Sequence, residues 1–421
     1  MQKFARRVGI GVVPVIVRRM NVDQARYDSI YNPFSPAAHF ALVAIAEASC
    51  VLSLFGSISI IYLIVRKNKL FSSGGKHVFH HIMFGLSLGD FVTTCGFLLQ
   101  PFLIPSYTHK PLAVGNTTTC EIAGFLGDFV ITSPMYSCIL SIYFLLTVRS
   151  GWSVEKTSRI LEPWIHFVAW MPPLLLASVS AAADLYNPRP LTGLCFTGYN
   201  PVDCAVNPDV SCERGGTLPT YISYGYLVLT VPPALVGIVC TWILHNSIVK
   251  QFRRSDRFDF RRIITARSSV IGAASATVID DAIPSTTDLH RRAIARQAVW
   301  YSVAFLNTFM SALVGVVVTT AATSSLEKLN TLQEASPGPY VAILVMCTMH
   351  PLQGFLNWLI YILPTIARWR DAYPDRSMLW AYRQILDGQI TPVTRKTVHL
   401  LNRQEHIEAG EEQGKVIATD A

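Results

Sequence analysis

The sequence contains few charged residues, and all of its lysines and arginines lie outside its long apolar stretches. Only 15% of the 421 residues are charged, whereas 51% are hydrophobic. That balance excludes an ordinary soluble domain and is typical of a chain that crosses a membrane several times. Seven stretches contain no lysine or arginine and are each long enough to span a bilayer as a helix: 39–65, 78–107, 120–148, 160–185, 218–249, 298–323 and 339–366.

Other absences narrow the classes of function. A retinal protein needs a membrane lysine for its chromophore, and none of the seven spans contains one. A zinc hydrolase needs converging metal ligands, and no His-Glu-x-x-His spacing occurs. Phosphate-cradling glycine loops and serine nucleophile elbows are also absent, so we expect no enzyme activity, catalytic residue, metal or cofactor. A seven-helix transporter, channel or membrane hydrolase is the alternative, although no internal repeat supports a transporter.

The basic residues that the spans lack are distributed unevenly over the connecting segments. If these segments alternate between sides, 25 of the 35 lysines and arginines fall on the side of the C-terminal tail and 10 on the side of the N-terminal tail. Because basic loops are retained in the cytoplasm, we expect the N-terminus outside and the C-terminus inside. The net charge of +8 then reflects topology and attraction to inner-leaflet lipid, and we expect no nucleic-acid partner.

The placement of cysteines agrees with this topology. Five of the nine lie inside spans, where thiols usually pack as small apolar groups: Cys50, Cys95, Cys138, Cys240 and Cys347. The other four lie on the expected outer side, where disulfides persist: Cys120, Cys195, Cys204 and Cys212. Four cysteines allow three pairings, and we favour Cys120 with Cys195 and Cys204 with Cys212, because the second pair closes a short local loop. Asn116 begins an outer Asn-Thr-Thr sequon and is a candidate glycosylation site.

Polar residues interrupt the seventh span on one face. Gln353, Asn357 and Tyr361 are spaced by four and therefore share a helix face. An amide in hydrocarbon needs a partner on another helix, so we expect this face to look into the bundle. Asp90 and Asn357 lie at similar depths, about 18 Å and 14 Å from the inner ends of their spans. We predict a contact between them and a switch network formed by Asp90, Asn357 and Tyr361.

Three further ionisable residues lie in the outer half of the expected bundle. Glu47 and Asp128 lie about 12 Å below the outer ends of the first and third spans, and His350 lies about 16 Å below that of the seventh. Because a membrane carboxylate is costly, pairing or function is its default interpretation. We predict a ligand pocket formed by Glu47, Asp128 and His350, which would favour a cationic group. A cyclic nucleotide would instead need basic residues from outer loops, such as Arg189 and Arg214.

The inner loop before the sixth span is strongly basic. Residues 291–297 lead into that span without a helix breaker, so we expect the helix to extend into the cytoplasm. Arg292 and Arg296 then share a helix face. Such a face is suited to an acidic partner on the inner side.

Both ends of the chain lie outside the expected bundle. Ile366, Trp369 and Tyr373 form an apolar stripe that predicts a short amphipathic helix on the inner membrane surface. Residues 1–20 resemble a signal peptide but for Pro14, so we expect no cleavage there, with a translation start at Met20 as the alternative. We therefore expect an outer tail, a seven-span domain and an inner helix with a disordered tail: 1–38, 39–366 and 367–421.

Several motifs, taken in order, are similar to those of a known receptor class. They are Leu86-Ser87-Leu88-Gly89-Asp90, Cys120 with Gly124-Phe125, Ser141-Ile142-Tyr143 before Arg149, Cys212-Glu213-Arg214-Gly215, Ala304-Phe305, and Pro351-Leu352-Gln353-Gly354-Phe355-Leu356-Asn357 followed by Tyr361. Through them, residues 39–373 resemble the G-protein-coupled receptor superfamily, and within it look most like the cyclic-AMP-receptor-like receptors of protists. The sequence departs from rhodopsin-like receptors because it lacks the Asp-Arg-Tyr triplet after the third span and a proline in the sixth.

The resemblance implies an all-α, seven-transmembrane receptor in the plasma membrane. Such a receptor passes the signal of an extracellular small-molecule or peptide ligand to a heterotrimeric G protein. The resemblance also implies that Cys120 is bridged to the second outer loop. The residues expected to contact the G protein are basic and lie on the inner side: Arg149, Arg253, Arg254, Arg292 and Arg296.

Overall fold

The computed structural model describes the seven predicted spans and most of the outer loops. The described residues are 34–66, 78–189, 192–201, 204, 210–216, 218–269, 286–324 and 337–387. The predictions for the first 33 residues and for the tail after residue 387 lie outside them. The chain forms two compact units, Met1–Trp358 and Leu359–Ala421, and each is described by itself.

Helices long and apolar enough to cross a membrane occur at every predicted span. Within the described ranges six spans pass this test directly, and a seventh is formed by a pair of helices bent by 45°. Five spans are single helices: α3 (Pro36–Arg66), α4 (Val78–Leu103), α7 (Val154–Ala182), α8 (Leu218–Ser269) and α9 (Thr286–Ser324). The prediction of an all-α, seven-transmembrane bundle is therefore confirmed. We keep the names outer and inner for its two sides, as the basic residues assign them.

The third span is a composite of four helical pieces. An α-helix, α5 (Thr117–Gly127), passes into a 3₁₀ turn, η2 (Asp128–Ile131), and then into a second α-helix, α6 (Thr132–Phe144). A π-helical turn, η3 (Leu145–Arg149), ends the span on the inner side. Such interruptions within a helix often mark functional hinges.

The seventh span is broken, whereas the sequence led us to expect one continuous helix over 339–366. It consists of α11 (Pro337–Met349) and α12 (Gln353–Ala372), and the break falls at residues 350–352. Pro351 explains it, because proline lacks an N–H group and disfavours a helical conformation for the residue before it.

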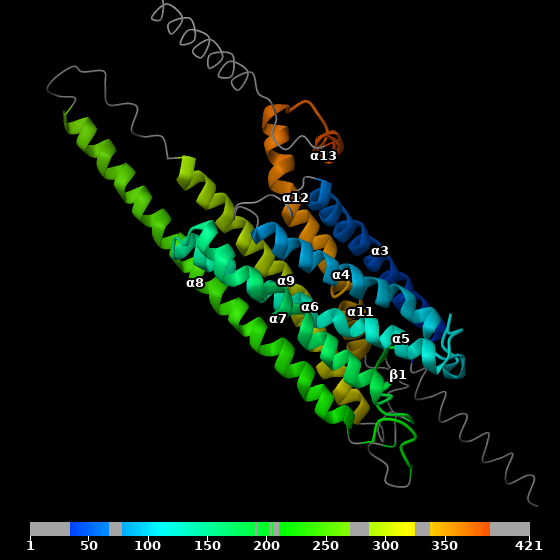
Figure 1. Cartoon of the computed structure of the whole chain (residues 1–421). Helices are drawn as coiled ribbons and strands as arrows, with labels where there is room; N and C mark the ends of the chain where they lie inside the picture. The colour runs from blue at the N-terminus through cyan, green and yellow to red at the C-terminus, as the bar shows by residue number, and fades with distance from the viewer. Residues whose placement is uncertain are drawn as a thin grey trace, which may run out of the picture. The chain divides into compact units, whose positions relative to one another are not determined.

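The helices of the first unit form a closed ring around α6. Figure 1 shows these helices packed side by side, seen from the side of the bundle. The central α6 contacts α4, α7, α8 and α9, and α11 closes the ring between α9 and α3. Small residues allow α3 and the start of α12 to approach closely. A Cβ on Gly56 would lie 2.6 Å from the carbonyl oxygen of Gly354. The sequence predicted close helix approach at this part of α3.

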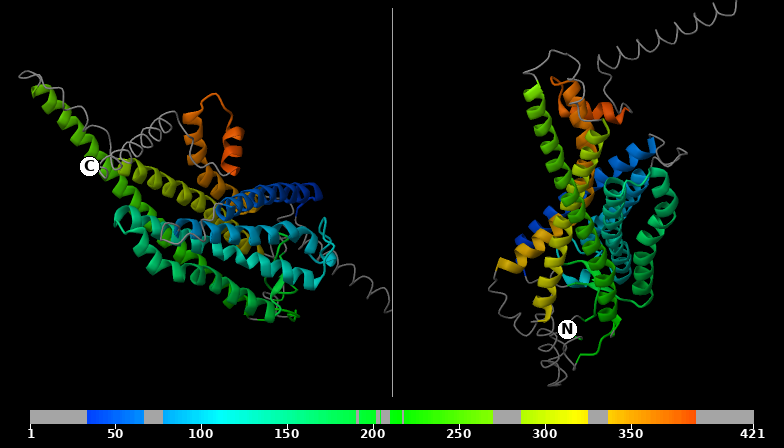
Figure 2. Two further views of the ribbon diagram at one scale, coloured as in Figure 1. Left: turned by 45° about the horizontal axis from the view of Figure 1, so that its top comes forward. Right: turned by 90° about the vertical axis from the view of Figure 1, so that its left-hand side faces the viewer.

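Two helices extend well past the bundle on the inner side. Figure 2 shows α8, which has 52 residues, running beyond the ends of its neighbours. About 20 residues suffice to cross a bilayer, so much of α8 lies outside it. The predicted extension ahead of the sixth span is confirmed, because α9 begins at Thr286.

The second outer loop contains a small antiparallel hairpin where the sequence predicted only an irregular, bridged loop. Strand β1 (Tyr186–Pro188) pairs with β2 (Cys195–Thr197), and Tyr186 lies opposite Thr197. Before the third span, a short 3₁₀ turn, η1 (Ser106–Thr108), shapes the first outer loop.

The second unit does not contain the predicted amphipathic helix as a separate element. Ile366 and Trp369 belong to the last turns of α12, Tyr373 follows directly after its end at Ala372, and a separate helix that was not predicted from the sequence, α13 (Met378–Leu386), follows after Pro374. Ser377 caps α13 by accepting a hydrogen bond from the N–H of Trp380. The Trp369 ring is buried and lies 5.6 Å from the ring of Trp380.

Candidate functional site

A polar network crosses the middle of the bundle. The Asp90 carboxylate on α4 accepts hydrogen bonds from Nδ2 of Asn357 at 2.8 Å and from Oγ of Ser133 at 2.9 Å. Asp90 is 5% exposed and Asn357 is 1% exposed. The predicted contact between the second and seventh spans is therefore present, and Ser133 adds the third span to it.

The network continues to the sixth span. Nε2 of Gln353 donates to Oδ1 of Asn357 at 3.3 Å, and the hydroxyl of Thr308 on α9 donates to Oε1 of Gln353. All three side chains are buried. The third predicted member, Tyr361, lies one turn farther along α12 in the second unit and is half-buried. Spans two, three, six and seven are thus joined by side-chain hydrogen bonds.

A cavity and a cluster of rings lie on the inner side of this network. Asn357 lines the cavity together with residues of α4, α6 and α9: Leu86, Ser137, Leu140, Ser141, Phe144, Ala298, Tyr301, Ser302 and Phe305. The ring of Tyr301 lies 6.4 Å from that of Phe144 and 6.5 Å from that of Phe79. These three rings join α9, α6 and α4, and we call them the inner aromatic cluster. Sequence reasoning missed it, because aromatic residues in apolar spans carry no distinguishing pattern.

The three predicted pocket residues have different surroundings. Asp128 is fully buried and accepts a hydrogen bond from the phenol of Tyr186. His350 lies at the break of the seventh span, with its ring 5.9 Å from that of Phe97. Glu47 is half-buried on α3. No hydrogen bond or ion pair joins any two of the three predicted residues within the part of the chain that the structure describes.

Both predicted outer disulfides are present. Cys120 is bonded to Cys195 on β2, and Cys204 is bonded to Cys212. Gln100 holds the first bridge to α4, because its Oε1 accepts from the N–H of Cys195 at 2.9 Å and its Nε2 donates to the same residue's carbonyl at 3.4 Å. The preferred pairing is thus confirmed.

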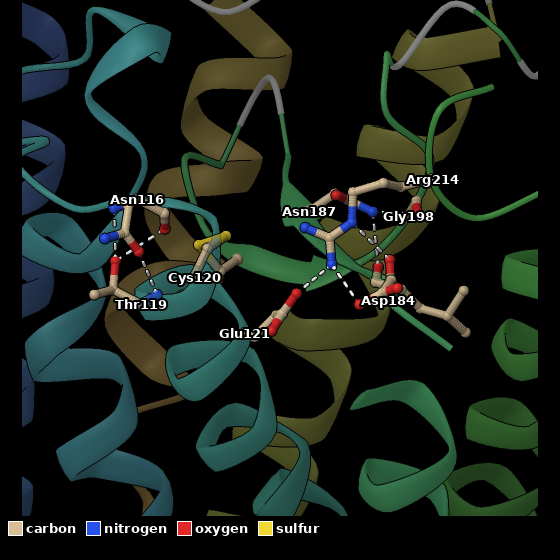
Figure 3. Close-up of polar contacts among 10 residues, drawn as sticks. Asn116, Thr119, Cys120, Glu121, Asp184, Asn187, Gly198 and Arg214 are labelled. Atoms are coloured by element: carbon tan, nitrogen blue, oxygen red, sulfur yellow. Dashed lines mark hydrogen bonds and ion pairs between the residues drawn. A yellow bond between two sulfur atoms is a disulfide. The ribbon is translucent and has the colours of Figure 1, made fainter. Parts of the chain in front are cut away.

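Arg214, close to the second bridge, ties the loop to α5 and to the turn that follows α7 (Figure 3). Its guanidinium donates to the Glu121 carboxylate on α5 and, at 3.3 Å, to the Asp184 carboxylate. Its Nε donates to the Asp184 carbonyl at 3.2 Å. The half-buried Arg189 donates to the carbonyl of Thr197. The two arginines considered for a cyclic nucleotide are therefore engaged in holding the loop.

Asn116 stands at the start of α5 and is exposed. Its Oδ1 accepts from the N–H of Thr119 at 3.0 Å, and the Thr119 hydroxyl accepts from the N–H of Asn116 at 2.8 Å (Figure 3). This reciprocal capping box stabilises the outer end of the third span. It uses the oxygen of the Asn116 amide, whereas a glycan would be attached to the nitrogen.

Basic residues flank the inner ends of the spans. Arg149 is exposed and ends the π-helical turn η3, and Arg296 is exposed on α9. The Lys156 ammonium makes a cation–π contact with Trp152, in the short connection after η3, and lies 4.3 Å from its ring centre. Arg253, Arg254 and Arg292 belong to α8 and α9, but their side chains lie outside the described residues.

The fold and the buried network define a seven-helix membrane protein. Comparison with family models agrees: the model of the Frizzled/Smoothened family membrane region matches residues 114–209. This range runs from the end of the first outer loop through the third and fourth spans into the second outer loop, and it covers less than a quarter of the 421 residues. A comparison with curated proteins found no match. The likeness to a family of signalling receptors supports a receptor role, while the narrower resemblance to cyclic-AMP-receptor-like receptors stays a prediction.

Proposed function

We propose that the chain is a plasma-membrane receptor that passes the signal of an extracellular small-molecule or peptide ligand to a heterotrimeric G protein. The observation that carries the proposal is the hydrogen-bonded chain from Thr308 through Gln353, Asn357 and Asp90 to Ser133. Four spans meet in it at mid-depth.

Such a network is suited to a two-state switch. Buried polar groups in an apolar interior are costly unless they are paired, so a helix cannot slide gradually out of its set of partners. It must instead exchange one complete set for another. A ligand then shifts the equilibrium only by its differential affinity for the two arrangements.

The outer half supplies the proposed ligand contacts. Glu47 and His350 are proposed to contact the ligand directly, and Asp128 to respond to it. The exposed Asn116 amide nitrogen is the proposed point of glycan attachment. Of these residues, Asn116 and Asp128 lie within the range 114–209 that is similar to a receptor family.

The inner face supplies the proposed G-protein contacts. These are Arg149, Arg253, Arg254, Arg292 and Arg296. The exposure of Arg149 and Arg296 and the long inner extensions of α8 and α9 support the proposal. A basic surface at these ends suits an acidic segment of a partner.

The test is nucleotide exchange on a panel of G proteins co-expressed with the full chain, measured without added ligand and during a screen of small metabolites and peptides. We expect at least one G protein to exchange nucleotide, and Asn357→Ala to abolish the response at equal surface level. Asn307→Ala is the matched control, because Asn307 is an exposed amide on α9 outside the network. Absence of exchange on every G protein from the same organism would overturn the proposal.

A further inference from the structure

The second outer loop reaches into the bundle through a single side chain. Tyr186, on β1, is 0% exposed although its strand belongs to a loop. Its hydroxyl donates to Oδ2 of Asp128 at 2.5 Å and lies 3.2 Å from the carbonyl oxygen of Ala177 on α7. The loop therefore occupies the interior acceptor that an outer ligand would otherwise meet.

The hairpin that carries Tyr186 is held in place by neighbouring groups. Nδ2 of Asn187 donates to the carbonyls of Leu185 at 3.2 Å and Gly198 at 2.9 Å, which joins the two strands. The disulfide of Cys195 attaches β2 to the outer end of α5. Tyr186 thus enters the bundle from a fixed support.

The third span is shaped to receive the ring. A Cβ on Gly124 would lie 2.4 Å from Cδ1 of Tyr186, so α5 has no room for a larger residue there while the ring is in place. Tyr226 on α8 also interacts with Asp128, and its ring lies 5.4 Å from that of Phe196 on β2. The Asp128 acceptor is therefore enclosed by the loop, the third span and the fifth.

Asp128 occupies the point where the third span changes from α-helix to 3₁₀ turn. It follows α5 directly and is the first residue of η2. Ser133, at the start of α6, donates to Asp90 in the central network. The Tyr186 contact and the central network are thus attached to the two ends of one irregular turn.

We propose that the β1–β2 hairpin is a built-in plug, and that the hydrogen bond from Tyr186 to Asp128 holds the third span in the arrangement seen here. This inference rests on the proposed receptor function and adds its regulation. A ligand acts by lifting or reseating the hairpin from the outer surface, so the loop itself is the ligand-responsive element. Withdrawal of the phenol frees η2 to rearrange and releases Ser133 from Asp90.

The experiment measures the inner ends of the third and sixth spans in the full chain, reconstituted in lipid nanodiscs. Spin labels at Ser150→Cys and Trp300→Cys, both exposed positions outside the proposed G-protein contacts, report the distance by pulsed electron resonance. Tyr186→Phe keeps the ring and loses the hydroxyl, whereas Gly124→Ala pushes the ring away. Loss of one buried hydrogen bond shifts a two-state ratio by about tenfold, so both variants should raise the second distance population by about that factor.

Tyr224→Phe is the matched control, because this tyrosine is 61% exposed on α8 and should leave the distances unchanged. If Gly124→Ala protein does not accumulate, Tyr186→Phe carries the test. Wild-type distances in a folded Tyr186→Phe protein would overturn the plug. A shift in distance without nucleotide exchange on any G protein supports the plug and overturns only the proposed coupling to a G protein. Nucleotide exchange without a shift in distance supports the coupling and overturns the plug.

Discussion

The outer and inner ends of the bundle are held together by different kinds of bond. At the outer end, two disulfides, the Arg214 ion cluster and the Gln100 contact fix the second loop to α4, α5 and the end of α7. At the inner end, the described contacts between spans include the inner aromatic cluster, a hydrogen bond between the hydroxyls of Thr241 and Ser302, and a contact between the His81 ring and the Glu162 carboxylate. The outer end is thus tied by covalent bonds and the described contacts of the inner end are non-covalent, so we expect the helices to move more easily at the inner end.

The largest expected effect on stability comes from removing a disulfide at the outer end. Cys120 and Cys195 are separated by 75 residues, whereas Cys204 and Cys212 are separated by 8. On the chain-entropy model, loops of these lengths contribute about 4.5 and about 2.5 kcal/mol of stability. Cys120→Ser should therefore lower the melting temperature of the purified protein markedly more than Cys204→Ser.

Melting in detergent, followed by the labelling of buried thiols, measures this difference. Cys138→Ser, at a free cysteine within the third span, is the control for loss of a thiol alone. Equal losses for the two bridge variants would contradict the chain-entropy account, in which the longer bridge contributes more to stability.

The next effect comes from the centre, where the two ends meet. Asp90→Ala leaves the Asn357 amide and the Ser133 hydroxyl without their acceptor, and each unpaired buried donor costs about 1–3 kcal/mol. We expect a loss of about 3 kcal/mol, and a smaller loss for Asp90→Asn, which keeps an acceptor. A double-mutant cycle with Asn357→Ala measures the coupling, and additive losses would contradict a shared network.

The sequence predicts the contacts at the centre of the bundle better than those at its two ends. Asp90 and Asn357 are rare polar groups in apolar spans, and their depths can be counted from the span ends, so their contact could be predicted. The preferred cysteine pairing followed from one short spacing. The break of the seventh span carried a signal in Pro351 that we did not use.

The contacts that sequence reasoning missed depend on register and rotation. Tyr186 meets Asp128 across 58 residues only because the hairpin positions β1 over the third span. Tyr301 joins Phe79 and Phe144 only because α9 is turned toward α4 and α6. Neither the position of the hairpin nor the rotation of α9 can be read from the sequence, because spans that are apolar on all sides show no preferred buried face.

A third change tests the inner end directly. Tyr301→Ala removes two ring contacts of the inner aromatic cluster, each worth about 0.5–1.5 kcal/mol. Loosening α9 from α4 and α6 should raise nucleotide exchange without ligand several-fold while stability falls only modestly. Trp300→Ala is the control, because Trp300 is 62% exposed, and an equal rise there would show that the cluster does not hold the inner end closed.

The smallest expected effect concerns a buried lysine of the outer end. Lys110, in the first outer loop, is 4% exposed, and burial lowers its pKa to about 7. An unfolded lysine keeps its proton up to a pKa of about 10.4, so the unfolded chain binds more protons above pH 7 and stability rises with pH from about 7 to about 10. Between pH 7 and pH 8 the gain is about 1 kcal/mol. Thermal melts in nanodiscs between pH 7 and pH 8 should show this rise in the wild type and a flatter profile in Lys110→Met. Parallel stability profiles for the wild type and Lys110→Met would mean that Lys110 keeps its proton in the folded protein. The outer end would then hold a buried charge in addition to its disulfides.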